Sequence, residues 1–134
     1  MSETDIQYLN DLIQAGNREI DNSFTMESMK LALGNFFQLS DYDDRIINQI
    51  LNKLSELGWD TIPEQTELNY LREGIKVSKV QLNSLIKSEK NVFESLDECL
   101  MIYRNYCINW IYLDQLKKSA IIMAKNYIKT KQES

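Results

Sequence analysis

Residues 63–87 decide the fold, and they read PEQTELNYLREGIKVSKVQLNSLIK. Pro63, the only proline in the chain, fits the first position of a helix, where its missing N–H leaves no hydrogen bond unmade. Behind it, one seam of side chains recurs at strict intervals of three and four residues: Leu68, Leu71, Ile75, Ser78, Leu82 and Leu85. Such a narrow seam is typical of a helix that packs along one partner helix. The sequence therefore predicts a helix over 63–87 and a partner for it.

The partner helix is expected directly downstream, over 92–130. The polar run 87–91 interrupts the seam, and Asn91 followed by Glu94 has the pattern of an N-cap with an acid at the third helical position. We therefore predict that 63–87 and 92–130 form a long antiparallel helical hairpin. Because the three-four spacing also runs on from the first segment into the second, one continuous helix through both is the alternative.

Amphipathic spacing upstream predicts three short helices, over 5–21, 26–38 and 41–57. The third has the clearest ends, because acidic residues fill its first turn and Gly58 fits the left-handed position after its last turn. Trp59 is then expected to fold back onto Leu54. The predicted fold is an all-α, single-domain helical bundle over 1–134, in which three short N-terminal helices precede the hairpin.

Composition excludes several kinds of chemistry. The 134 residues contain two cysteines and no histidine, so Ser-His-Asp and Cys-His catalysis, His-liganded metals and a Cys₄ zinc site are ruled out. Cys99 and Cys107 are eight residues apart, which on one helix is about 12 Å and beyond the reach of a disulfide. We expect two buried free thiols in a reducing compartment, and no cofactor or metal.

Neither the first residues nor the most apolar stretch has the pattern of a targeting or membrane segment. Residues Met1–Asp5 are acidic and lack the basic and apolar regions of a signal peptide. The stretch 99–113 carries Arg104 and is too short and too polar to span a bilayer. We therefore expect a cytoplasmic protein without membrane contact.

Charge is distributed unevenly around the net value of −5. Residues 1–67 hold 13 acidic and four basic side chains, whereas 68–134 hold seven and 11. The candidate anion-binding residues form a cluster of lysines near the end of the chain: Lys117, Lys118, Lys125, Lys129 and Lys131. A solvated face at a helix C-terminus is the simpler explanation of these lysines, and attraction to the acidic half is a further alternative. A small helical nucleic-acid-associated subunit is thus one alternative function, with weak binding indifferent to base sequence.

Two pairs of carboxylates give the second alternative. Glu64 and Glu67, and then Glu94 and Asp97, are each three residues apart, which places each pair on one helix face. The pattern resembles the ExxE…ExxD signature of all-α nucleotide pyrophosphohydrolases of the MazG type, and the resemblance implies magnesium held by paired carboxylates from adjacent helices. In the predicted hairpin the two pairs lie about 30 Å apart, so only a dimer or a different bend would join them.

The last predicted helix has an apolar face too wide for one neighbouring helix to cover. Its polar pairs recur at multiples of seven residues, but Ile111 and Tyr112 stand where polar side chains are expected, and Ile108 and Ile122 lie beside that line. Either the short N-terminal helices cover these four residues as core, or they face a second copy or another protein. We expect a non-catalytic protein–protein interaction module acting through this face, such as an adaptor, inhibitor, immunity-type protein or assembly or regulatory subunit.

Overall fold

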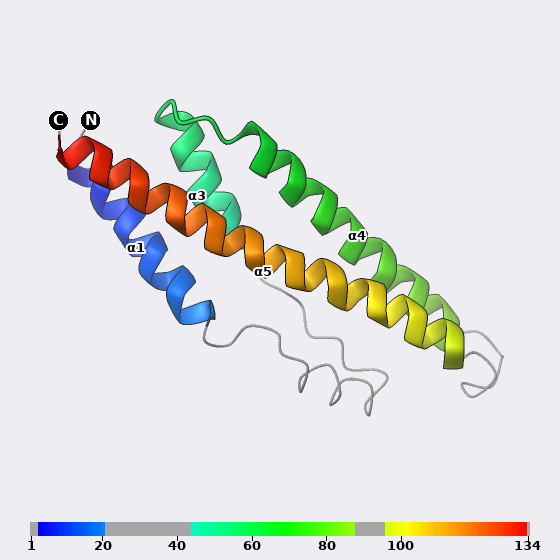
Figure 1. The fold of residues 1–134 in the computed structure, drawn as a ribbon. Helices are drawn as coiled ribbons and strands as arrows, with labels where there is room; N and C mark the ends of the chain where they lie inside the picture. The colour runs from blue at the N-terminus through cyan, green and yellow to red at the C-terminus, as the bar shows by residue number, and fades with distance from the viewer. Residues whose placement is uncertain (1–2, 21–43, 88–95, 134) are drawn as a thin grey trace. The chain divides into compact units, whose positions relative to one another are not determined.

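A computed structural model of the chain describes residues 3–20, 44–87 and 96–133 (Figure 1). All regular structure within these ranges is helical: α1 (Glu3–Ile20), α3 (Arg45–Glu56), α4 (Ile62–Lys87) and α5 (Leu96–Gln132). The predicted all-α fold class is therefore confirmed. The helix predicted over 26–38 lies outside the described residues.

Helix α3 buries one stripe of aliphatic side chains and ends as predicted. Its buried residues are Ile46, Ile47, Ile50, Leu51 and Leu54. After its last turn Gly58 adopts a φ of +90°, and its N–H donates to the Ser55 carbonyl while the N–H of Trp59 donates to that of Leu54. This pair of hydrogen bonds is a Schellman motif, and glycine fits it because a Cβ would be strained at that φ. The start differs from the prediction, since α3 begins at Arg45 with Asp44 at its N-cap.

Helix α4 begins at Ile62, one residue earlier than predicted, so Pro63 occupies the second helical position. Proline is still tolerated there, because the first four N–H groups of a helix have no partner within it. Just before α4, Thr61 is buried and its hydroxyl donates to the Leu51 carbonyl over 3.5 Å, while the Asp60 carboxylate accepts from the N–H of Ile62 over 3.3 Å. The connection between α3 and α4 is thereby fixed by its own side chains.

The chain divides into two compact units, which we describe separately. Among the described residues, unit 1 contains 3–20, 44–68 and 113–133, and unit 2 contains 69–87 and 96–112. In unit 1, α1 and α3 meet the C-terminal half of α5 around Gly16, where an added Cβ would lie 2.8 Å from Cδ1 of Ile121 and 3.5 Å from Cγ2 of Ile46. The absence of a side chain at Gly16 thus lets three helical segments approach closely.

Polar and aromatic contacts support the unit 1 core. The Lys53 ammonium lies 2.8 Å from the Asp5 carboxylate, and this hydrogen bond raises the pKa of Lys53. The rings of Trp59 and Tyr127 meet edge to face with their centroids 5.6 Å apart. Trp59, which follows the Schellman turn, therefore connects the end of α3 to α5.

The core of unit 2 has a different chemistry, because it is built mainly on the phenol, indole and thiol side chains of α5. The cluster consists of Leu82, Cys99, Ile102, Tyr103, Tyr106, Cys107 and Trp110, with Ile75 and Leu85 packed against it. Residues of α4 and α5 share this cluster, so a single straight helix through both segments is wrong. Both cysteines are buried and free, which confirms the prediction for the thiols.

Candidate protein interface

The structure places all four predicted partner-binding residues on the surface of α5. The exposed fractions are 39% for Ile108, 38% for Ile111, 50% for Tyr112 and 56% for Ile122. The first three belong to unit 2 and the fourth to unit 1. Since Ile111 and Tyr112 are three and four residues after Ile108, they share one side of the helix with it. None of the four belongs to the core that the described residues form.

Sequence reasoning missed further exposed apolar side chains in unit 2. Helix α4 exposes Tyr70, Val77 and Val80, and α5 exposes Leu100 and Met101. A signal for the α4 residues exists, because Tyr70 and Val77 are seven residues apart and Val80 follows three later, which traces a second stripe beside the predicted seam.

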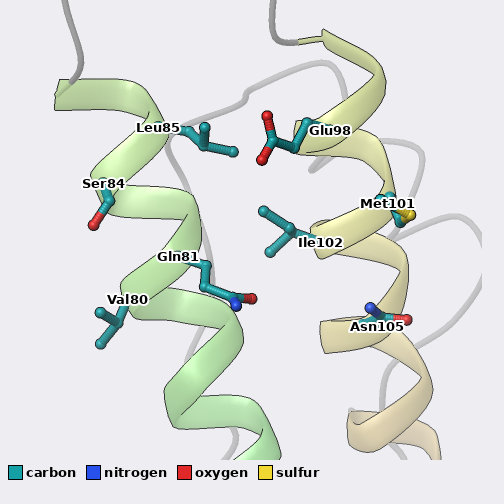
Figure 2. A pocket seen from close by; sticks show the side chains of 8 residues that line it. All are labelled: Val80, Gln81, Ser84, Leu85, Glu98, Met101, Ile102 and Asn105. Atoms are coloured by element: carbon teal, nitrogen blue, oxygen red, sulfur yellow. The ribbon is translucent and has the colours of Figure 1, made fainter.

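A groove runs between α4 and α5 in unit 2. One hollow of about 540 Å³ is lined by eight residues: Val80, Gln81, Ser84, Leu85, Glu98, Met101, Ile102 and Asn105 (Figure 2). A second hollow of about 430 Å³ extends from Tyr70 to Asn109 and shares Gln81 and Asn105 with the first. The two hollows therefore form one continuous groove, which we call the α4–α5 groove.

A glycine sets the spacing of the two helices along the groove. A Cβ at Gly74 would lie 2.7 Å from Nδ2 of Asn109, so the Asn109 amide packs directly against the backbone of α4. Any larger residue at this position would push the amide aside. Gly74 and Asn109 thereby fix how closely α4 and α5 approach each other in unit 2.

Burial changes the pKa of three titratable groups in the unit 2 core, Cys107, Tyr103 and Tyr106. Burial raises the pKa of the Cys107 thiol to about 11, against which a hydrogen bond from Tyr103 acts only partly. Burial also raises the pKa of Tyr106 to about 12 and that of Tyr103 still further. These groups are therefore neutral near pH 7 and act as packing side chains.

The lysine cluster divides into one buried and four exposed side chains. Lys117 is only 1% exposed, and its ammonium lies 3.5 Å from Oδ1 of Asp114, whose other oxygen is 3.2 Å from the Lys118 ammonium. Lys117 is thus enclosed beside a carboxylate, whereas Lys118, Lys125, Lys129 and Lys131 are exposed. The hypothesis of anion binding remains a prediction, and the exposed lysines are the ones to which it applies.

The carboxylates of the pyrophosphohydrolase-like pattern that the structure describes are divided between the two units. Glu64 and Glu67 belong to unit 1 and Asp97 to unit 2, while Glu94 lies outside the described residues. Across residues 3–20, 44–87 and 96–133, no three His, Cys, Asp or Glu side chains are grouped so that they could hold a metal ion.

Comparison with known proteins gives no match to a family model, a curated protein or a solved structure. In the part of the chain that the structure describes, no helix is long and apolar enough to cross a membrane. A proposal for the function therefore depends on the surface of the two units, and above all on the exposed apolar side chains of α5.

Proposed function

We propose that the protein is a non-catalytic protein–protein interaction module that binds through the exposed side of α5 in unit 2. The observation that carries this proposal is the joint exposure of Ile108, Ile111 and Tyr112 on one side of the helix. Contiguous apolar side chains at the surface of a folded unit are typical of interaction sites, whereas single ones are ordinary. Tyrosine in particular is enriched at protein interfaces because it combines a large apolar ring with a polar hydroxyl.

The proposal includes the finer architecture expected from the sequence. Three short N-terminal helices would precede an antiparallel hairpin of the segments 63–87 and 92–130, and the hairpin would present the binding side of α5. The partner would be a second copy of the chain or another protein, with the chain acting as an adaptor, inhibitor, immunity-type protein or assembly or regulatory subunit. A cytoplasmic location would keep the two free thiols reduced.

The test is association of the intact chain, measured with Ile111→Lys/Tyr112→Glu. Light scattering would measure self-association, and affinity capture from the native source with mass spectrometry would measure partner binding. We expect wild type to show self-association, partner binding or both, and the double variant to lose at least one of those that wild type shows. The reason is that two charges in an apolar interface would be buried unpaired.

A matched control adds the same two charges on another helix. Gln14 and Asn17 of α1 are exposed and polar, so Gln14→Lys/Asn17→Glu should associate as wild type does. Association retained by Ile111→Lys/Tyr112→Glu, or lost equally in both variants, would contradict the proposed function.

A further inference from the structure

The α4–α5 groove has the length of a short helix. Its two hollows share Gln81 and Asn105 and extend along α5 from Glu98 to Asn109. These end residues are 11 positions apart, which corresponds to about 16 Å, or three turns of an α-helix. An elongated site of this length between two helices is suited to an occupant that is itself helical.

The lining of the groove combines apolar side chains with amides. Val77, Val80 and Met101 are 45%, 59% and 61% exposed, and Ile108 adds a further branched side chain. The amides of Gln81, Asn105 and Asn109 line the groove between them. In Figure 2 the side chains of Ile102 and Leu85 point across the gap toward the facing helix, while Asn105 lies further along α5. An amphipathic helix would meet these groups with one apolar face.

Among the described residues, the charged side chains that line the groove all have one sign. Each hollow has one of them, which is Glu98 in the first and Glu73 in the second. No lysine or arginine of the described ranges lines either hollow. Because Glu73 is next to Gly74, which faces Asn109, and Glu98 is 11 residues before Asn109, the two carboxylates belong to opposite ends of the groove. The complementary partner is therefore basic at both ends.

We propose that the α4–α5 groove binds an amphipathic helix of another protein that carries two basic residues about three turns apart. This rests on the proposed function and specifies the partner for the same unit. A second copy of the same groove is a poor partner, because it would bring four glutamates of like charge into one interface.

The probe is a fluorescein-labelled synthetic peptide of 18 residues with one leucine face, an alanine- and glutamine-based remainder and two lysines 11 positions apart. The matched peptide has glutamates in place of both lysines. Fluorescence anisotropy with the full chain should give about tenfold or greater preference for the lysine peptide, since two partly exposed ion pairs are formed instead of two repulsions. The preference should fall with added salt.

Two protein variants with the same change in net charge test whether the preference for the lysine peptide arises in the groove. Glu73→Gln/Glu98→Gln removes the groove carboxylates and should reduce the preference to about twofold or less. Glu67→Gln/Asp97→Asn removes two exposed carboxylates outside the lining and should retain it. Equal binding of both peptides, no binding of either, or loss of the preference in the second variant as well would overturn the proposal.

Failure of this inference can be told apart from failure of the proposed function. If the lysine peptide does not bind but Ile111→Lys/Tyr112→Glu still abolishes association, the groove proposal is wrong and the α5 interface stands. If self-association is lost in Glu73→Gln/Glu98→Gln while no peptide binds, the groove takes a basic segment of a second copy and the proposal of a helix from another protein is wrong.

Discussion

The two units use the same long helix in different ways. In unit 1, α5 packs against α1 and α3 mainly through aliphatic and small side chains, closely enough that Gly16 leaves no room for a Cβ without a shift of Ile121. In unit 2, the described core consists mainly of aromatic and thiol groups, and α4 and α5 leave a groove and several exposed apolar side chains. Burial on α5 is thus decided by packing neighbours, and not by the hydropathy of each residue.

Two neighbouring isoleucines in unit 1 give the largest expected difference in the free energy of unfolding. Ile121 is 3% exposed and contacts the site of Gly16, whereas Ile122 points to solvent. Ile121→Ala should lower the free energy of unfolding by about 2–5 kcal/mol, because it removes buried methyl groups and leaves a cavity, whereas Ile122→Ala should cost about 0.5 kcal/mol or less. Urea unfolding of both variants measures the difference, and equal losses would contradict the assignment of the two faces.

Two adjacent lysines provide the next comparison. Lys117 is enclosed beside Asp114, whereas Lys118 reaches the same carboxylate from solvent. Lys117→Ala should lower the free energy of unfolding by about 2 kcal/mol, because it removes a partner of a nearly buried carboxylate and also a buried side-chain stem. Lys118→Ala should lower the free energy of unfolding by about 0.5 kcal/mol or less. Thermal melting followed by circular dichroism gives both values, and a larger loss for Lys118→Ala would refute this placement.

The pH dependence of stability should be stronger for the core of unit 2 than for that of unit 1, in which burial also raises the pKa of Tyr127. Burial raises the pKa of Cys107 from 9.0 to about 11 and that of Tyr106 from 10.0 to about 12, so the unfolded chain loses these protons first as pH rises. Their contribution to stability is complete below about pH 9 and is lost progressively between pH 9 and 12. The urea midpoint should therefore fall over this range, and less steeply in Cys107→Ala/Tyr106→Phe.

The two tryptophans make this test specific to each unit. Trp59 lies in unit 1 and Trp110 in unit 2, so Trp59→Phe leaves fluorescence that reports on unit 2, and Trp110→Phe leaves fluorescence that reports on unit 1. We expect the alkaline decline to be detected first by Trp110. A decline that Trp59 detects at lower pH than Trp110 would contradict the assignment to the thiol and phenol cluster.

Local signals in the sequence were sufficient for the fold class and for one helix end. Gly58 and Trp59 were predicted as a left-handed turn with the chain folding back onto Leu54, and the hydrogen bonds of the turn follow that pattern. Such a turn depends on the φ of one glycine and on residues a few positions away, which the sequence contains. The start of α3 at Arg45 was less well predicted, because several acidic residues in succession could each cap it.

Only part of the candidate site could be predicted from the sequence, because the site depends on how the helices pack. Ile111 and Tyr112 could be found because they interrupt the periodic pattern of polar residues along the helix. The α4–α5 groove could not, because predicting it requires knowing which faces of the two helices meet. For Lys117, residue type alone favours exposure, because lysine is normally solvated. Its position four residues after Leu113 and three before Ala120 places it on the buried stripe, so periodicity could have shown its burial.

The central claim is that Ile111 and Tyr112 are available for binding and are not needed to hold the fold. Circular dichroism and thermal melting of Ile111→Lys/Tyr112→Glu test it most directly. We predict that the helical signal is retained and that melting stays cooperative, with the midpoint within about 5 °C of wild type, because exposed positions tolerate charge. Loss of the helical signal or of cooperative melting would show that these side chains are core and would contradict the account.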